Sequence, residues 1–378
     1  MKKLFKTYIV SLILISNYVI GQQKLSLSDA VKITLENNLD IKIVENQDEI
    51  FKNNASFLNS GYLPTISSKA GINKSEQNIE IETPNNLSGK LDNMKSENSY
   101  SNISLNYILL DNSGRNFNYK KSKELSNRSK LEVKEVIENT LLQLFTVYYE
   151  VCRLFEEREI IKSSLEISKT RLERKNTEFE FGQSTKLEVL NAEVDVNTDS
   201  IKLLSSIKNL SNAKRDLNLI MNVELNSNYE LDRNVIYNSK DKISEFYKNA
   251  GENNTRLKIY DKSVDISNYE LKSIKSTYLP TIGLVGSYDW NESVNDNPYA
   301  FFNKNIYDGI SGGINLSWNI FSSGKRITAN KNAKIKLENS KIEKEKVFLI
   351  FQKELKNAYE SYINNLFILE VQEKSLLT

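Results

Sequence analysis

The feature that most limits the fold of this chain is a stretch without glycine or proline that runs from Arg115 to Glu180. Glycine and proline are the residues that most often end or bend a helix, so their absence favours one long helix. At about 1.5 Å per residue, such a helix would be roughly 100 Å long, more than a compact domain can cover. Apolar residues recur within it at helical spacing: Leu141, Leu144, Phe145, Tyr148, Val151 and Cys152.

A helical hairpin is predicted because this pattern is interrupted at Phe181–Thr185 and resumes from Lys186 to Met221. Lys and Glu crowd the other positions, which favours a solvated coiled coil over a helix in lipid. We therefore expect an antiparallel hairpin over 115–221 with its turn at Gly182, since a tight turn between helices favours positive φ. Spacings of three and four residues after the turn predict this seam on the returning helix: Leu187, Leu190, Val194, Ile201 and Leu204.

The composition excludes several classes of function. Lys and Arg number 51 and Asp and Glu 49, so the chain lacks the basic excess that typifies a nucleic-acid partner. It has no His and one Cys, Cys152, which excludes His-based catalysis, His-containing zinc sites and a disulfide framework. A glycosidase-like carboxylate pair is the alternative, but the acids alternate with Lys along helices. We expect no enzyme, no cofactor and no metal.

Residues 1–21 have the organisation of a secretory signal peptide. The apolar run is shorter than the roughly 20 residues of a transmembrane helix, although an uncleaved N-terminal anchor is the alternative. We therefore expect export of the protein. The basic start is formed by Lys2, Lys3 and Lys6, and the apolar run extends from Tyr8 to Ile20. Val19 and Gly21 are the compact residues of the cleavage site before Gln22.

An internal repeat divides the rest of the chain. A Ser-Gly pair precedes each long helix, at Gly114 and at Gly324. We expect repeat 1 over 22–221, a connector over 222–252, and repeat 2 over 253–378 with a long helix from 325. Two motifs recur with the same separation of 216 residues: Asn37–Ile43 as Asn253–Ile259, and Tyr62–Ile66 as Tyr278–Ile282.

Alternating segments predict two β-strands in each repeat, at about 65–73, 100–110, 281–290 and 310–321. They have about 9 to 11 residues, the length of a strand tilted across a bilayer. The polar set predicted to face a lumen comprises Ser311, Asn315, Ser317 and Asn319. The apolar set predicted to face lipid comprises Leu284, Tyr288, Trp290, Ile310, Ile314, Leu316, Trp318 and Ile320.

Alternation by itself is also compatible with soluble hairpins that place one face on a core. Both tryptophans of the chain lie in these strands, which suits the aromatic girdles of an outer-membrane barrel. Four strands cannot close a barrel, since the smallest membrane barrels have about eight. Symmetric association would supply the missing strands, with eight from two copies or twelve from three.

The chain resembles the TolC-like family of outer-membrane efflux proteins over residues 24–378. The most specific part is Phe179–Glu193, which is similar to the family's turn signature of an aromatic residue, a glycine and an acid-Val-Leu-x-Ala sequence. The Leu-Pro-Thr sites at 63–65 and 279–281 support the resemblance. So do the two Ser-Gly entries to long helices.

The resemblance implies an α+β channel-tunnel in the outer membrane of a Gram-negative bacterium, with a periplasmic extension. Each protomer of a homotrimer would give four transmembrane strands to a twelve-stranded barrel and its long antiparallel helical hairpins to a periplasmic tunnel. The implied partners are outer-membrane lipid, a periplasmic adaptor (membrane fusion) protein and an inner-membrane pump. The implied function is a passive conduit of a tripartite efflux or type I secretion system. An exported coiled-coil scaffold, or a surface structural protein with soluble β-hairpins, is the alternative.

The resemblance also assigns roles to residues near the hairpin turn. Glu188 matches an acidic position of the family's aperture network, although an ordinary coiled-coil charge is the alternative reading of it. The aperture residues of the family's second hairpin have no counterpart in this sequence. The residues implied to dock the adaptor are Phe181, Gly182, Gln183, Ser184 and Thr185.

The second hairpin is expected to be incomplete. Counting from Gly324 with the spacing of repeat 1, the second turn would fall beyond Thr378. We therefore expect roughly 50 residues of hairpin to be absent from this sequence, which would make it a C-terminally truncated member of the family.

Overall fold

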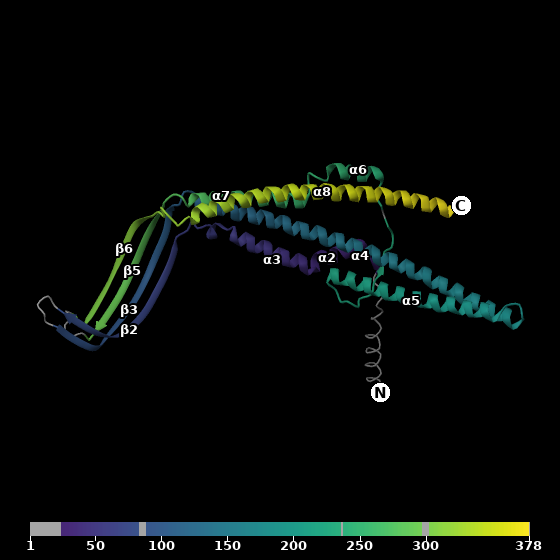
Figure 1. The fold of residues 1–378 in the computed structure, drawn as a ribbon, viewed down its shortest axis with the longest axis horizontal. Coiled ribbons are helices and arrows are strands. Elements are labelled where there is room, and N and C mark those ends of the chain that lie inside the picture. The colour runs from purple at the N-terminus through teal and green to yellow at the C-terminus, as the bar shows by residue number, and fades with distance from the viewer. Residues whose placement is uncertain (1–23, 83–87, 236, 297–301, 378) are drawn as a thin grey trace, which may run out of the picture. The chain divides into compact units, whose positions relative to one another are not determined.

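The computed structural model describes residues 24–82, 88–235, 237–296 and 302–377 (Figure 1). The signal peptide expected over 1–21 lies outside the described residues. The chain divides into two compact units. The first comprises Met1–Gln47, Glu132–Thr255 and Ser361–Thr378, and the second comprises Asp48–Leu131 and Arg256–Glu360.

The first unit is built on a helical hairpin. Helix α4 (Gly114–Glu180) enters this unit at residue 132, turns back, and continues as α5 (Lys186–Met221). The core lies between the two helices, where Leu144, Tyr148 and Val151 of α4 pack with Leu210 and Leu217 of α5, all at most 4% exposed. The two long helices, separated only by a short turn, confirm the hairpin predicted from the stretch without glycine and proline.

Short elements close one end of this core. Helix α2 (Leu27–Asn37) begins at a capping box, in which Ser26 and Asp29 each accept a hydrogen bond from the other's backbone N–H. It continues after a break as α3 (Leu39–Asn54), and Asn38 at the break donates to the Ile220 carbonyl at 2.8 Å. The remaining elements of the unit are β1 (Lys24–Leu25), which pairs in parallel with β4 (Glu230–Leu231), and α6 (Lys240–Asn249).

The face of α5 that packs on α4 is not the one predicted. The five apolar residues expected in the seam, Leu187 to Leu204, are 46% to 68% exposed. Both faces repeat every three or four residues, and the buried one interrupts its large apolar residues with small or polar ones, so the continuous run of large apolar residues pointed to the wrong face. The buried or half-buried seam is Val189, Ala192, Val196, Asp199, Leu203, Ser206, Leu210, Ala213, Leu217 and Ile220.

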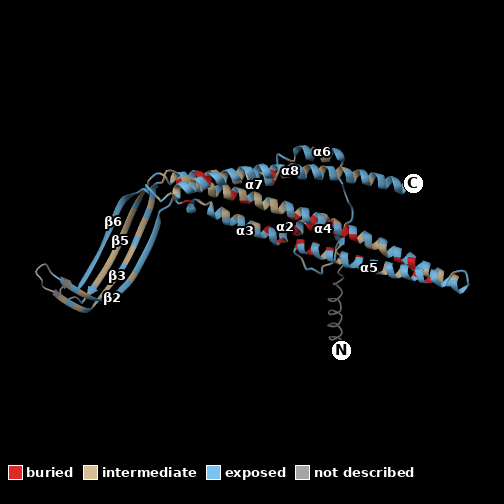
Figure 2. Ribbon diagram, viewed as in Figure 1, coloured by how far each residue is buried: buried red, intermediate tan, exposed pale blue. Residues whose placement is uncertain are grey.

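The second unit contains one antiparallel sheet in the order β2-β3-β5-β6. Its strands are β2 (Thr65–Glu82), β3 (Ser88–Leu110), β5 (Thr281–Asn295) and β6 (Lys304–Ser317). No described residue of these four strands is buried, whereas the buried residues of the chain lie mainly on the helices (Figure 2). Both faces of the sheet are therefore uncovered in the single chain.

The strands differ in length from the prediction. β2 continues past residue 73 and β3 begins well before residue 100, because charged cross-strand pairs such as Lys74–Glu97, 2.9 Å apart, extend the ladder beyond the alternating region. The last strand begins at Lys304 instead of 310 and ends at Ser317 instead of 321. Trp318, Asn319 and Ile320 therefore lie outside the strand to which they were assigned.

The early end of β6 has a physical cause in the turn that follows. The Trp318 indole donates to the Tyr278 carbonyl at 3.1 Å, and Arg326 donates to the Ile320 carbonyl at 2.8 Å. These bonds hold 318–320 against the segment before β5 and the start of α8, and the next residue in register, Pro280, has no N–H to continue the ladder.

Three helices accompany the sheet in the second unit. α7 (Thr255–Ser276) lies between the start of α4 and the start of α8 (Lys325–Leu377) (Figure 1). Lys262 of α7 pairs with Glu124 of α4 at 2.8 Å, and Ser267 of α7 shares a 2.7 Å hydrogen bond with Ser340 of α8. A short 3-10 helix, η1 (Phe57–Asn59), precedes β2.

Arginine residues hold both places where a strand passes into a long helix. At the first joint, the Arg115 guanidinium donates to the carbonyls of Gly61 and Leu109 and lies 4.9 Å from the Tyr62 ring centroid. The two donors and the ring stacking fix the guanidinium between the start of β2 and the end of β3.

The second joint repeats this arrangement. Arg326 donates to the carbonyls of Thr277 and Ile320 and lies 5.0 Å from the Tyr278 ring centroid. The two joints thus use the same residue types and the same kinds of contact.

We expect Tyr148→Phe to destabilise the first unit by about 1 kcal/mol. The buried Tyr148 hydroxyl lies 3.0 Å from the Leu25 carbonyl and 2.9 Å from the Asp232 carbonyl, and burial raises its pKa to about 12. Thermal unfolding followed by circular dichroism measures the loss. Tyr149→Phe is the matched control on the next residue, and an equal loss in both variants would contradict this role.

Candidate functional site

The register of the sheet places three of the four residues of the predicted polar set on one face, whereas Asn319 lies beyond the end of β6. Ser311 pairs with Ser287, Asn315 with Gly283, and Ser317 with Thr281. Hydroxyls meet across the strands of this face, at 2.9 Å between Ser67 and Ser104 and at 2.8 Å between Ser287 and Ser311. Small polar side chains thus line this face from β2 to β6.

The same register places six of the eight residues of the predicted apolar set on the opposite face, whereas Trp318 and Ile320 lie beyond the end of β6. Leu316 pairs with Ile282, Ile314 with Leu284, and Ile310 with Tyr288. β3 adds Ile103 and Leu105, and β2 adds Ile66 and Ile72, so the apolar face crosses all four strands. Ile310 is 87% exposed and Ile314 is 72% exposed, which leaves a large apolar surface in contact with solvent in the single chain.

Charged residues mark one end of this apolar face. Beyond Trp290 the face carries Glu292, which pairs with Lys304 at 2.6 Å, and Lys74, which pairs with Glu97. From Ile282 to Trp290 the apolar stretch of β5 has nine residues, which matches the roughly 9–11 residues of a tilted strand crossing a bilayer. None of the described helices is long and apolar enough to span a membrane.

The hairpin tip is a compact turn stabilised by backbone bonds. α4 ends in a Schellman motif, in which Gly182 N–H donates to the Phe179 carbonyl and Gln183 N–H to the Glu178 carbonyl, at 2.9 Å and 2.7 Å. Gly182 has the positive φ of +72° that this motif requires. Thr185 then caps α5 by accepting from the Glu188 N–H. The turn therefore presents Phe181 to solvent, with 75% of its surface exposed.

Glu188 links the two helices at this tip. Its carboxylate accepts from the Ser184 hydroxyl at 2.6 Å and from Lys175 of α4 at 3.0 Å. The bond from Ser184 has the larger effect and the bond from Lys175 the smaller, and together they hold the pKa of Glu188 below its ordinary value of 4.5. Lys175 also pairs with Glu178 at 2.8 Å, so a single ammonium lies between two carboxylates, which raise its pKa.

A comparison with known protein families identifies the kind of protein that carries these surfaces. Residues 30–223, about half of the chain, match the family of outer membrane efflux proteins. The chain belongs to this family. It is an outer-membrane efflux channel.

Solved structures share the fold of this efflux channel. The outer membrane protein VceC of Vibrio cholerae has a TM-score of 0.67 at 10% identity, over 85% of this chain and 75% of that one. The CmeC outer membrane channel of Campylobacter jejuni gives 0.68 at 16%, over 86% and 68%. The MtrE channel of Neisseria gonorrhoeae gives 0.56 at 12%, over 88% and 72%. No curated protein sequence matches the chain.

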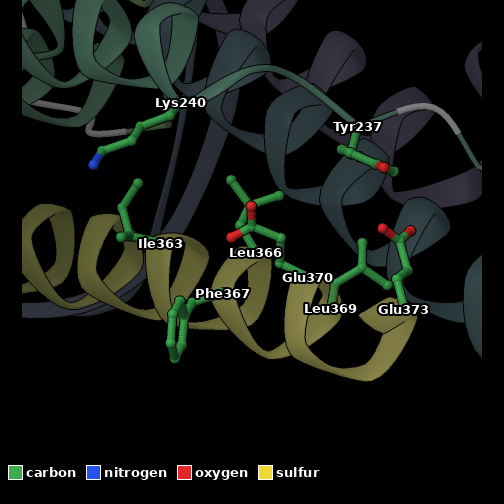
Figure 3. Close-up of a pocket in the computed structure, with 8 residues that line it drawn as sticks. All are labelled: Tyr237, Lys240, Ile363, Leu366, Phe367, Leu369, Glu370 and Glu373. Carbon is green, nitrogen blue, oxygen red and sulfur yellow. The ribbon is translucent and has the colours of Figure 1, made fainter. Parts of the chain in front are cut away.

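A separate cavity of about 350 Å³ lies in the first unit, between the residues before α6 and the last part of α8 (Figure 3). Ile363, Leu366 and Leu369 line it from α8, and Tyr237 and Lys240 line it from the other side. Its lining consists of apolar side chains and the charged groups of Lys240, Glu370 and Glu373, and it contains no nucleophile beside a base. In the described parts of the chain, no three His, Cys, Asp or Glu side chains are grouped so that they could hold a metal ion.

Sequence reasoning found the tip and the strand faces but missed two features of them. It treated Glu188 without its partner Lys175, which lies on the preceding helix and becomes a neighbour only when the hairpin closes. It also missed the face of α5 that packs on α4 and assigned the seam to the exposed face instead. The signal for the packed face was present as a second set of positions spaced by three and four residues.

We expect the tip of this efflux channel to loosen in acid. Because the pKa of Glu188 is depressed in the folded state, its stabilisation is fully present above pH 4.5 and is lost as the pH falls through the lower folded value. The protection factors of the Gly182 and Gln183 amides, which compare the exchange rate with the intrinsic rate at each pH, should fall over that range. In Glu188→Gln this fall should be absent, and an unchanged acid response in that variant would contradict the assignment.

We expect Gly182→Val to weaken the turn by about 1–2 kcal/mol, the cost of the left-handed conformation for a residue with a Cβ. No atom lies within 4 Å of the Cβ position at Gly182, so the effect should come from the backbone alone. Gly182→Asn is the control, because asparagine tolerates positive φ. Local hydrogen exchange measures both, and equal protection in the two variants would rule out backbone strain as the cause.

Proposed function

We propose that three copies of the chain close a twelve-stranded barrel in the outer membrane of a Gram-negative bacterium and extend a helical tunnel into the periplasm. The observation that carries this proposal is a four-stranded sheet with one apolar face, one polar face and no buried residue among those described. A barrel places the apolar face in lipid and the polar face around an aqueous lumen. A soluble scaffold would need a core against the apolar face, and the described strands have none.

The second face of α5 supports the tunnel. Leu187, Leu190, Val194, Ile201 and Leu204 are exposed on α5, while the opposite seam already packs on α4. A helix with two seams needs a helix on each side, as in a closed ring of helices. We propose that neighbouring helices of the assembled tunnel cover this second face.

The hairpin tip is the proposed docking surface for a periplasmic adaptor protein that connects the tunnel to an inner-membrane pump. Phe181 supports this, because its exposed ring projects from a turn whose backbone is already fixed. Docking on such a turn costs little ordering entropy. The proposed residues are Phe181, Gly182, Gln183, Ser184 and Thr185. Glu188 is proposed to belong to the aperture network, through the carboxylate that now accepts from Lys175.

In this mechanism the chain acts as a passive conduit. The polar face presents hydroxyl and amide groups that are not arranged as a catalytic site. These groups hydrogen-bond the water around a passing solute and leave the solute chemically unchanged. Efflux and type I secretion both use a conduit of this kind, and the pump supplies the energy and the choice of substrate.

We expect Leu316→Arg to reduce the amount of membrane-inserted protein strongly, whereas Asn315→Arg is tolerated. Leu316 lies on the apolar face and Asn315 on the polar face. An arginine on the lipid face costs about 2–4 kcal/mol near the midplane of the bilayer, and one in the lumen costs far less. Outer-membrane fractionation measures insertion. Equal loss for the two neighbouring substitutions would reject the assignment of the faces.

We expect Phe181→Ser to lower adaptor cross-linking several-fold, because an exposed aromatic ring is the type of residue that dominates binding energy in a small contact. A cysteine at Gln183 serves as the cross-linking site, and the native Cys152 is buried. Ser205→Ala, at an exposed position of α5 well away from the turn, is the control. Unchanged cross-linking and efflux in the Phe181 variant would show that the adaptor docks elsewhere.

A further inference from the structure

One row of side chains on the polar face of the sheet carries charge. Lys69 of β2 pairs with Asn102 of β3, and Asn102 pairs with Asp289 of β5. The three residues therefore lie at one level on three consecutive strands. With strands about 4.8 Å apart, Lys69 and Asp289 are separated by roughly 10 Å at the backbone.

Lys69 and Asp289 are the only charged residues that the register places on this face within 65–75, 96–108, 281–295 and 305–317. The other positions of the face in these ranges hold Ser, Asn, Gly, Thr, Tyr, Val and Ile. The charged side chains of the same strands, among them Lys74, Glu97 and Glu292, lie on the opposite face. Over these ranges, a solute that passes along the polar face thus meets one cation and one anion per chain.

The two charges are held differently. The Asp289 carboxylate accepts from the Asn102 amide and from the Ser287 hydroxyl, which fixes it against the sheet. Ser287 in turn shares a hydrogen bond with Ser311 of β6, so this network spans three strands. Lys69 is exposed and has a long flexible side chain. A fixed anion and a mobile cation therefore share one level.

The position of the row gives it influence over passage. Asp289 lies between Tyr288 and Trp290, at the end of the apolar stretch that is followed by Glu292. The row is thus at the outer margin of the membrane-crossing part of the strands. Glycine at 309, which pairs with Asp289, leaves the carboxylate uncovered on the side of β6.

We propose that Lys69 and Asp289 determine the ion preference of the conduit by balancing each other at this level. The inference rests on the proposed conduit function. Neutralising one partner leaves the other as the nearest uncompensated charge to a passing ion. The carboxylate alone favours cations, and the ammonium alone favours anions.

Salt should control the size of the effect. The Debye length is about 30 Å at 0.01 M salt and about 3 Å at 1 M. A charge on the wall of a wide barrel therefore acts on ions in the lumen at low ionic strength and is screened at high ionic strength. This dependence separates an electrostatic role of the row from a change in barrel structure.

The experiment measures reversal potentials of the purified full chain in planar bilayers under a potassium chloride gradient centred near 0.01 M and again near 1 M. Lys69→Gln should raise the cation-to-anion permeability ratio by roughly twofold at low salt, and Asp289→Asn should lower it by a similar factor. The double variant should return near the original ratio. Lys74→Gln is the control, because Lys74 lies on the same strand but on the opposite face.

The outcomes separate the two proposals. The role of the row would be overturned, and the conduit function left intact, if both single variants kept the permeability ratio of the unmodified chain. An equal shift in Lys74→Gln would have the same consequence. A shift that persists at 1 M salt would also overturn it. Absence of any conductance from the unmodified chain would overturn the conduit function and this inference together.

Discussion

The backbone edges of the sheet are the constraint on which the rest of the structure depends. In the described structure, β2 pairs only with β3 and β6 only with β5, so each outer strand leaves its N–H and C=O groups open on one side. Water can satisfy these groups, but lipid cannot, and an unsatisfied group in a bilayer costs several kcal/mol. A chain with this apolar face must therefore find further strands before or during insertion.

The helices face the same requirement in a weaker form. The exposed seam of α5 and the exposed apolar residues Ile160 and Ile167 of α4 leave hydrophobic area in water on a hairpin whose inner seam is already packed. The sheet edges thus lack hydrogen-bond partners, and the second helix face lacks a surface that would bury its apolar side chains. The proposed assembly of several protomers would satisfy both at once.

Much of the architecture could be predicted from the sequence because it follows from local periodicity. The absence of glycine and proline between Arg115 and Glu180 is sufficient for one continuous helix, and alternation at Ile310–Leu316 is sufficient for the two faces of a strand. The glycine at 182 marks the turn because a positive φ is required there.

The remaining features depend on contacts between distant residues. The end of β6 at Ser317 is set by bonds to Tyr278 and Arg326, which no pattern within the strand contains. The packed seam of α5 was missed because side-chain size favoured the other face, although Ala192 and Ala213 are buried. Lys69 and Asp289 are 220 positions apart in sequence, and only the strand register shows that they share a level.

The paired arginine joints have a consequence for the order in which the chain can fold. Arg115 reaches back 54 residues to Gly61, and Arg326 reaches back 49 residues to Thr277. By contrast, Asn102 and Asp289, which join the two halves of the sheet, are 187 residues apart. Contacts between near neighbours in sequence close faster than distant ones, because less chain entropy is lost. Each half can therefore complete its own strand pair and joint first, and the central pairing of β3 with β5 then joins two finished hairpins.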